Sequence, residues 1–408
     1  MSDVPLTILV AARDEEARVG TTVAQLRRLF PDAQVIVADD GSRDATAHVA
    51  ASAGARVVRL PRRGKGQALT LAEREAMPGP LLLCDADLRG DLRPLHAAEA
   101  DVAIAAFARR QGGGFGLAKG VARRLIALAC GRETREPLSG QRALSERGRA
   151  ACFPVAAGFG VEARMTADAV RAGLVVEEVE LELQHRATTR DAAGFAHRGR
   201  QLRDILLAFG PQAVNHRGLR LPLAGWVVGV AQPSVAPVAL IGLADDLWSG
   251  EERGFRAHLR AGRTTGVLKL VGIPAYALLR TRSVSGALLV ALTANTLNQL
   301  DTRPGRALKV FALGSLAVRP RAPGALAAAV LLAPYDLGEM AMLGDSGSNA
   351  LGAVLGFSSV EQLTRRQRWS AIAALAGLTL LGERRSLGTL IEETPPFRQL
   401  DALGRQPV

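Results

Sequence analysis

The chain has 408 residues, which is too long for one ordinary core, so two domains are expected. Charged residues cluster before about residue 220 and become sparse afterwards, where long uncharged runs appear. The formal net charge of +12 does not indicate a nucleic-acid partner, because the basic residues are scattered and aromatic residues, at 4%, are too few for base stacking.

The first half alternates short apolar runs with helical patterns. This alternation predicts an α/β fold with a doubly wound, mostly parallel sheet. The expected strands are Leu6–Ala12, Gln34–Ala38, Ala55–Leu60, Leu81–Cys84 and Val102–Ala105. Ligands bind such sheets beyond the carboxyl ends of the strands, so chemistry is expected just after each run.

Polar clusters follow the first four of these runs. They are Ala12–Glu16, Asp39–Ser42, Arg62–Gly66 and Asp85–Asp87. A helix cap by Asp14, Asp39 or Ser42 could explain any one cluster. It does not explain four clusters at corresponding positions, and these therefore indicate a binding site.

Asp85 and Asp87 flank one residue on an extended segment, so both carboxylates could face one hard cation. A magnesium or manganese ion that bridges a pyrophosphate is the usual reason for such a pair. Lys65 lies between two glycines that allow backbone to approach a ligand, and it could add positive charge at the same phosphates.

The order of the motifs ARDEE, ADDGSRD, GKGQA and CDADL resembles that of the inverting GT-A nucleotide-sugar glycosyltransferases. The resemblance covers roughly residues 5–210. Ser139–Arg142 and Phe159–Glu162 resemble the later signatures of dolichyl-phosphate-mannose synthase-like and glucosyl-3-phosphoglycerate synthase-like enzymes. The resemblance implies a GT-A domain over residues 1–210 that uses a nucleoside diphosphate sugar and Mn²⁺ or Mg²⁺.

The resemblance also implies roles for individual residues. The implied nucleotide-sugar site comprises Ala11, Arg13, Glu15, Asp40, Lys65 and Asp85. Asp85 and Asp87 would form the metal-binding DXD element, and His185 would complete the metal site. The usual proline and asparagine of the first motif are Ala11 and Asp14 here, so uridine and guanosine both stay open as the base.

Glu162 is the third candidate catalytic residue, with Asp85 and Asp87. It could orient the acceptor or act as the base, or it could form a buried ion pair with Arg142. A phosphate acceptor would need no strong base, since an anionic oxygen already attacks well once it is positioned.

The second half contains apolar runs close to the length of a membrane span. Leu221–Leu243 and Ser283–Leu300 are the longest, and shorter runs follow. They predict an all-α multi-span membrane domain over residues 211–408, in a protein of the cell membrane whose N-terminal domain is cytoplasmic. Buried helices of a soluble domain are the alternative.

Three polar motifs interrupt these apolar runs, and their carboxylates could gather around one magnesium ion. The motifs resemble those of polyprenyl-phosphate N-acetylhexosamine-1-phosphate transferases over about residues 235–360. The resemblance implies a lipid-phosphate role for two aspartates, active-site positions for an asparagine and an aspartate, magnesium ligation by a further aspartate, and a nearby lysine. In that order these residues are Asp245, Asp246, Asn298, Asp301, Asp345 and Lys269.

The sequence lacks the early helices and the late histidine-rich loop that this transferase family has. Two roles therefore stay open for the second half, an active phosphotransferase or an anchoring remnant. The whole chain is predicted to move a sugar from a nucleoside diphosphate sugar to a membrane-associated acceptor, a polyprenyl phosphate or another lipid-linked acceptor. A bifunctional enzyme and a non-catalytic nucleotide-sugar-binding scaffold are the alternatives.

Overall fold

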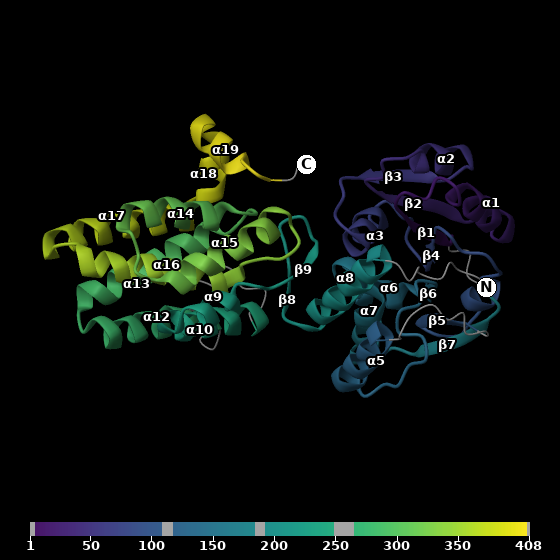
Figure 1. The fold of residues 1–408 in the computed structure, drawn as a ribbon, viewed down its shortest axis with the longest axis horizontal. Coiled ribbons are helices and arrows are strands. Elements are labelled where there is room, and N and C mark those ends of the chain that lie inside the picture. Colours follow the sequence, from purple (N-terminus) through teal and green to yellow (C-terminus); the bar gives the residue numbers. More distant parts are fainter. Residues whose placement is uncertain (1–4, 108–116, 184–191, 249–264, 406–408) are drawn as a thin grey trace. The chain divides into compact units, whose positions relative to one another are not determined.

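The computed structural model describes residues 5–107, 117–183, 192–248 and 265–405. The chain forms two compact units (Figure 1). Unit 1 holds the chain up to residue 210 together with residues 217–220, and unit 2 holds residues 211–216 and 221–407.

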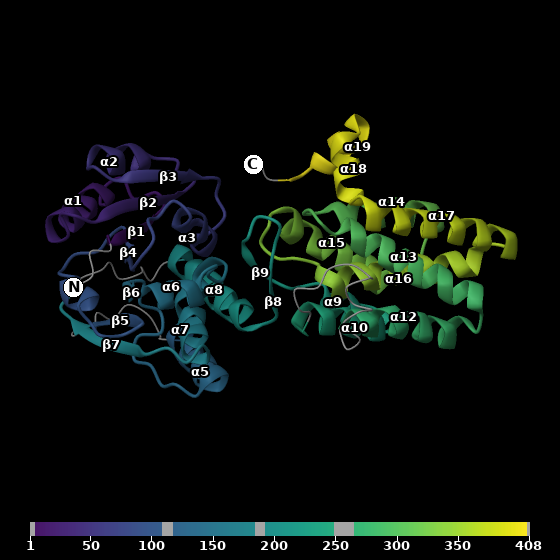
Figure 2. The same ribbon diagram turned by 180° about the vertical axis from the view of Figure 1, so that it is seen from behind.

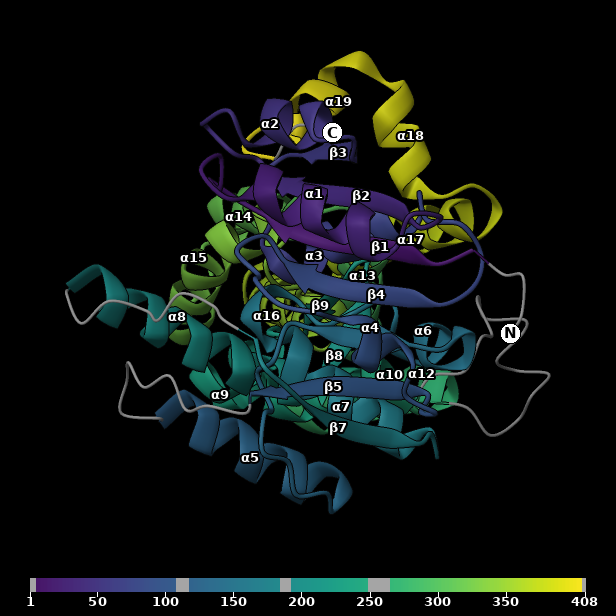
Figure 3. The same cartoon turned by 90° about the vertical axis from the view of Figure 1, so that its right-hand side faces the viewer.

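Unit 1 is built on a seven-stranded sheet with the order β3-β2-β1-β4-β6-β5-β7. Figure 3 shows β3, β2, β1 and β4 in this order, with β5 and β7 beyond them. Its strands are β1 (Thr7–Ala12), β2 (Gln34–Asp40), β3 (Arg56–Leu60), β4 (Leu81–Asp85), β5 (Val102–Phe107), β6 (Arg142–Leu144) and β7 (Val176–Leu181). All neighbours pair in parallel except β6, which is antiparallel to both β4 and β5. A mostly parallel α/β sheet is what the alternating pattern predicts.

Helices cover both faces of this sheet, so its central strands are buried on both sides. The helices are α1 (Val19–Leu29), α2 (Thr46–Ser52), α3 (Lys65–Glu73), α4 (Arg93–His96), α5 (Leu117–Cys130), α6 (Glu146–Cys152), η1 (Gly158–Gly160), α7 (Val161–Arg171) and α8 (Ala192–Phe209). Residues of α1, α2 and α4 pack on one face, and residues of α3, α6 and α7 pack on the other. This two-sided burial explains the continuous apolar runs in the strands.

Unit 2 is helical apart from a short sheet of β8 (Gln212–Val214) and β9 (Arg220–Pro222). Its helices are α9 (Trp226–Ala231), η2 (Pro233–Val235), α10 (Ala236–Trp248), α12 (Thr265–Thr281), α13 (Val284–Leu300), α14 (Arg306–Val318), α15 (Pro323–Leu337), α16 (Gly344–Gln362), α17 (Arg365–Arg384), α18 (Leu387–Glu393) and α19 (Pro395–Ala402). Helices α13 and α16 lie side by side in the bundle (Figures 1 and 2). The core between the helices is rich in alanine, valine and leucine.

The predicted multi-span membrane domain is wrong. Among the described residues, no helix combines the length and the apolar character that a membrane crossing requires. The run Leu221–Leu243 is divided among β9, α9 and η2 before α10 begins, and α10 has only 13 residues. Helix α13 has 17 residues, about 26 Å at 1.5 Å per residue, against a hydrocarbon core of about 30 Å.

The two longest helices of unit 2, α16 and α17, carry polar residues at their ends. Helix α16 begins with Asp345, Ser346 and Ser348, and helix α17 carries arginines at both ends. Apolar runs in unit 2 therefore supply a helical core, and sequence hydropathy alone does not distinguish that use from a membrane span.

Candidate active site

The strand order of unit 1 brings the predicted site residues to one edge of the sheet. In the parallel register Ala11 of β1 lies level with Asp85 of β4, and Ala12 lies level with Asp39 of β2. The loops that follow β1, β2, β3 and β4 therefore converge, as the carboxyl ends of parallel strands must.

The loops after β1 and β2 are joined by side-chain to main-chain hydrogen bonds. The Asp14 amide donates to Ser42 Oγ (3.0 Å), and the Arg43 amide donates to Asp14 Oδ1 (2.9 Å). The Glu15 amide donates to Thr46 Oγ1 (2.7 Å). Helix α2 has no side-chain cap, so these polar residues hold the two loops together rather than cap that helix.

Three of the predicted nucleotide-binding residues lie on or just after β1. Ala11 is the fifth residue of that strand and is partly exposed. The Arg13 guanidinium lies 3.7 Å from the Asp14 carboxylate, and Arg18 Nη1 donates to Glu15 Oε2 at 2.5 Å. Arg13 and Glu15 thus present charge at the sheet edge.

Asp40, at the end of β2, holds the loop that leads to α3. Its Oδ1 atom accepts hydrogen bonds from the amides of Arg63 (2.6 Å) and Gly64 (3.0 Å). Burial raises the pKa of Asp40, although these two amides oppose the shift. The residue fixes the main chain directly before Lys65.

Lys65, the first residue of α3, joins two carboxylates from distant parts of the sequence. Its Nζ atom lies 2.7 Å from Asp85 Oδ1 and 2.7 Å from Glu162 Oε1. Burial opposes the charged form of Lys65, but the charges of Asp85 and Glu162 outweigh burial and raise its pKa. The site therefore holds a permanent cation between two of the three candidate catalytic residues.

Glu162 pairs with Lys65, and Arg142 has other partners. Arg142, at the start of β6, is fully buried and donates to Thr166 Oγ1 (2.9 Å) and to the carbonyl oxygen of Ser139 (3.0 Å). Burial lowers the pKa of Arg142 to about 10. Arg142 thus braces the turn before β6, and the Glu162 carboxylate faces the site.

Gln141 and Gly140 position Asp85, and neither was singled out for this role from the sequence. Gln141 Nε2 donates to Asp85 Oδ2 at 3.1 Å from a buried position. A Cβ built at Gly140 would lie only 2.7 Å from Asp85 Cγ. The signal lies in Ser139–Arg142, but the strand that follows has only three residues, which is too short for a periodicity to show.

The predicted metal site is partly described. Asp85 and Asp87 offer carboxylate oxygens, the ligands that Mg²⁺ and Mn²⁺ prefer, and Gly140 leaves room beside the Asp85 carboxylate. Their chemistry thus fits a hard divalent cation. His185, the third predicted ligand, lies outside the described residues. Within the described ranges, no three acidic, histidine or cysteine side chains form a metal-binding group.

Unit 2 gathers a second polar cluster from residues far apart in the sequence. Lys269 of α12 donates to Asp245 Oδ2 (2.9 Å) of α10 and also to Asp345 of α16. Asp246 accepts hydrogen bonds from the amides of Asp345 (2.8 Å) and Ser346 (2.9 Å). Burial raises the pKa of Asp345 to about 7, and the charge of Lys269 opposes that shift.

Asn298 of α13 joins this cluster. With its amide oriented to satisfy its neighbours, its nitrogen lies 2.7 Å from Asp345 Oδ1 and its oxygen lies 3.2 Å from Lys269 Nζ. Asp301 follows directly after α13, and burial together with the charges of Asp336 and Asp345 raises its pKa. The six candidate residues of unit 2 thus lie close enough to interact.

A family model, glycosyl transferase family 2, matches residues 7–126. The matched region runs from β1 into α5 and includes Lys65, Asp85 and Asp87. A search of curated proteins gave no match to the chain.

Solved structures of glucosyl-3-phosphoglycerate synthase from Mycobacterium tuberculosis are similar to this chain. The complex with phosphoglyceric acid is 27% identical, with a TM-score of 0.42, and the match covers 50% of this chain and 78% of that one. The complex with Mg²⁺ and UDP is 26% identical, with a TM-score of 0.43, and the match covers 50% of this chain and 78% of that one. The complex with Mn²⁺, UDP-glucose and glycerol 3-phosphate is 24% identical, with a TM-score of 0.41, and the match covers 50% of this chain and 79% of that one.

The match to the family 2 model confirms the predicted enzyme class, a nucleotide-sugar-dependent glycosyltransferase, and the matched residues 7–126 lie in unit 1. All residues matched by the family model lie in unit 1, so the model gives no support to a fused sugar-1-phosphate transferase.

Proposed function

We propose that unit 1 transfers a sugar, with inversion, from a nucleoside diphosphate sugar at the edge of its sheet where β1, β2 and β4 end. The observation that carries this proposal is the bridge of Lys65 between Asp85 and Glu162, within and beside the family 2 domain. It places a fixed positive charge and two carboxylates where the loops of a parallel sheet bind ligands.

The residues of this edge divide the work of holding a donor. The joined loops that carry Arg13 and Glu15 present charged groups for the nucleoside, and Asp40 fixes the loop before Lys65. The Lys65 ammonium can stabilise the negative charge that develops on the leaving diphosphate. Glu162 is oriented by the same ammonium and is placed to orient the acceptor.

Asp85 and Asp87, with His185 as the third candidate, would hold the divalent cation. Bound there, Mn²⁺ or Mg²⁺ would neutralise part of the charge of the leaving diphosphate. Gln141 keeps the Asp85 carboxylate in one orientation, which reduces the reorganisation needed when a cation binds.

We further propose an acceptor with a phosphate group and a lipid tail, such as polyprenyl phosphate. Support comes from the surface of unit 2, which exposes large apolar side chains on several helices, and such surfaces commonly mark interaction sites. The exposed residues include Leu268, Val271, Leu278, Leu279, Leu313, Leu316, Val330, Leu331, Leu380 and Leu381. A phosphate oxygen already carries the negative charge that a nucleophile requires.

An acceptor screen tests the proposal. The full chain is incubated with UDP-sugars or GDP-sugars, Mn²⁺, and either polyprenyl phosphate or 3-phosphoglycerate, and release of nucleoside diphosphate and product mass are measured. Release should require the cation and should stop in Asp87→Ala. The matched control is Asp91→Asn, because Asp91 pairs only with Arg93 on the surface in the described structure. Tight donor binding without turnover on any acceptor would indicate a scaffold instead.

The cluster of unit 2 favours a second candidate function, a sugar-1-phosphate transfer. The specific observation is that Lys269, Asp245, Asp345 and Asn298 come together from four helices, although they are far apart in the sequence. Release of UMP rather than UDP, lost in Asp345→Ala but retained in Asp87→Ala, would establish this activity. Absence of UMP with every lipid phosphate tested would refute it.

A further inference from the structure

The C-terminal strap, defined here as residues 386–405, packs on unit 2 with an inverted polarity. Asp401 of α19 is only 6% exposed, whereas Phe397 and Leu400 of the same helix are 57% and 54% exposed and Leu403, directly after it, is 62% exposed. An ordinary amphipathic helix buries its apolar side chains and exposes its charges. Helix α19 does the reverse, so charge holds it in place more than apolar burial does.

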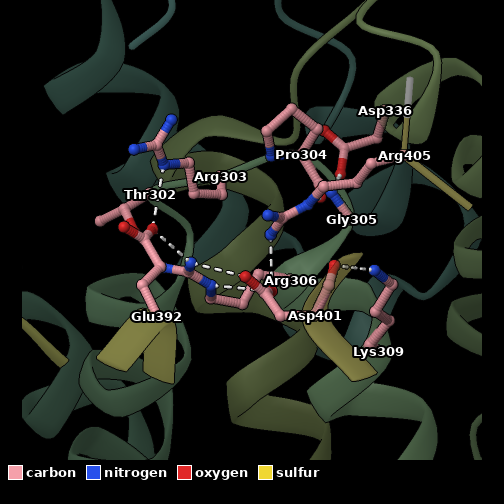
Figure 4. Close-up of polar contacts among 10 residues, drawn as sticks. All are labelled: Thr302, Arg303, Pro304, Gly305, Arg306, Lys309, Asp336, Glu392, Asp401 and Arg405. Carbon is pink, nitrogen blue, oxygen red and sulfur yellow. Dashed lines mark hydrogen bonds and ion pairs between the residues drawn. The ribbon is translucent and has the colours of Figure 1, made fainter. Parts of the chain in front are cut away.

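The strap is held mainly by Arg306, the first residue of α14, which is 2% exposed (Figure 4). Arg306 Nε donates to Asp401 Oδ1 at 3.0 Å, and Nη2 donates to Asp401 Oδ2 at 2.7 Å. Nη2 also donates to Glu392 Oε1 at 2.9 Å. This two-pronged arrangement suits a carboxylate and a phosphate equally well.

Further cations surround these two carboxylates (Figure 4). Arg303 Nε donates to Glu392 at 3.1 Å, and Arg405 Nη2 donates to Asp401 at 2.5 Å. Lys309 Nζ donates to the main-chain carbonyl of Asp401 at 2.5 Å. Burial, together with the charge of Arg405, lowers the pKa of Lys309. Three cationic side chains outside the strap, Arg303, Arg306 and Lys309, therefore face its two carboxylates, and Arg405 pairs with Asp401 within the strap.

The third carboxylate in the group does not belong to the strap. Asp336 accepts a hydrogen bond from the Gly305 amide at 2.7 Å, and this bond anchors the loop before α14. Without the strap, the three cations Arg303, Arg306 and Lys309 outnumber the two remaining carboxylates, Asp336 and Asp301, of which Asp301 interacts with Arg306. The excess of positive charge would favour an anion with more than one negative charge.

Departure of the strap would leave the Arg306 guanidinium without its charge partners. A buried charge without a partner is strongly destabilising, so the strap can leave readily only if another anion takes its place. The segment contributes limited apolar burial, since Leu387 is its only fully buried large apolar residue among those described and Leu390 and Ile391 are partly buried. Replacement of the strap by an anion therefore costs little hydrophobic contact.

We propose that the strap is an internal occupant of an anion-binding site centred on Arg306, and that a phosphate or pyrophosphate group competes with its carboxylates. The ligand class follows from the guanidinium geometry and from the excess of cations. This site is formed by residues of unit 2 alone, and the proposal does not depend on the activity of unit 1.

Binding of an anion at this site would affect the polar cluster of unit 2 that contains Asn298 and Asp345. Arg306 Nη1 donates to Thr302 Oγ1 at 2.7 Å, in the loop that begins at the end of α13. Gly388 of the strap packs against the same two residues, and a Cβ there would lie 2.5 Å from Arg306 Nη1. Asn298, which contacts Asp345, lies four residues before Thr302. Exchange of the strap for an anion would thus act at the helix end that presents Asn298.

Hydrogen exchange of the full chain with inorganic pyrophosphate tests the proposal. Pyrophosphate should accelerate exchange of the strap amides by about tenfold or more, while sodium chloride of equal ionic strength should do so far less. Equal acceleration by both salts would show that simple screening releases the strap and would overturn the proposal. No acceleration by pyrophosphate at millimolar concentration would overturn it as well.

Variants separate a ligand site from a merely structural ion pair. Asp401→Asn removes the competitor, so it should free the strap and tighten pyrophosphate binding by about tenfold. Glu392→Gln, at a half-exposed position, should act in the same direction more weakly and serves if Asp401→Asn fails to fold. The matched control is Glu393→Gln, which affects only an exposed pair with Arg385. A freed strap without any pyrophosphate binding would show a structural pair and refute the site.

Discussion

Each unit of this protein holds a lysine between two carboxylates, but the surroundings of the two lysines differ. In unit 1, Lys65 bridges Asp85 and Glu162 where the loops of a parallel sheet converge. In unit 2, Lys269 bridges Asp245 and Asp345 among packed helices.

The difference lies in how much negative charge each lysine must balance. Around Lys269 burial raises the pKa of Asp246, of Asp301 and of Asp345, so carboxylates outnumber the nearby cation. The carboxylate partners of each lysine stabilise its ammonium and raise its pKa, but no further carboxylate with a raised pKa pairs with Lys65 among the described residues. The arrangement around Lys65 is suited to receive a diphosphate with a metal ion. The arrangement around Lys269 requires additional cations.

Removal of the Lys65 charge should have the largest effect. Lys65→Met is expected to lower the rate of nucleoside diphosphate release by roughly 10²–10³-fold, because a fixed charge at the leaving group is lost. Steady-state kinetics with saturating Mn²⁺ measure this effect. Arg59→Met, on the exposed side of β3, is the control and should keep the full rate. An unchanged rate in Lys65→Met would separate this lysine from catalysis.

A methyl group at Gly140 should reduce the same activity by about 10²-fold, because it displaces the Asp85 carboxylate. Gly120→Ala is the matched control, since a Cβ at Gly120 meets no atom within 4 Å. Kinetics at several Mn²⁺ concentrations measure both variants. Equal activity of the two alanine variants would show that the position of Asp85 does not limit the reaction.

Loss of Lys269 should affect stability and leave glycosyl transfer unchanged. Lys269→Met leaves Asp245 and Asp345 without their cation, at an expected cost of about 1–3 kcal/mol in the free energy of unfolding. Chemical denaturation measures the cost. Glu393→Gln, in an exposed pair, should change stability by less than about 0.5 kcal/mol. Loss of glycosyl transfer in Lys269→Met would contradict the separation of the two units.

The smallest expected effect is a pH dependence from Asp336. Burial raises its pKa from 3.8 to about 6, so the folded chain keeps this proton at pH 5 whereas the unfolded chain releases it. Its contribution to stability is therefore complete below pH 3.8 and is lost as pH rises through about 6. Asp336→Asn cannot titrate, so wild type should lose Tm relative to the variant across this range. A constant Tm difference would contradict the assignment.

The donor-site edge of unit 1 could be predicted from the sequence because strand ends of a parallel sheet converge whatever their spacing in the chain. Asp85 and the loop before Lys65 are examples, since each follows a recognisable apolar run. The role of Gln141 could not be predicted, because β6 is a three-residue antiparallel strand and its pairing with β4 depends on the tertiary fold.

In unit 2 the polar residues of the motifs could be identified from the sequence, but the fold that holds them could not. The composition of α13 predicts a membrane span, whereas its 17 residues fall short of the length that a span requires. The pairing of Arg306 with Asp401 could not be predicted either, because the two positions lie 95 apart in the sequence and neither belongs to a periodic pattern.

The central claim is that the donor binds in unit 1 with the help of a divalent cation. Calorimetric titration of the full chain with UDP-sugar and with GDP-sugar, in Mn²⁺ and in EDTA, tests it directly. The account predicts binding of a donor that requires Mn²⁺, is lost in Asp87→Ala and persists in Asp345→Ala. Binding that survives in Asp87→Ala but disappears in Asp345→Ala would place the donor in unit 2 and contradict the account.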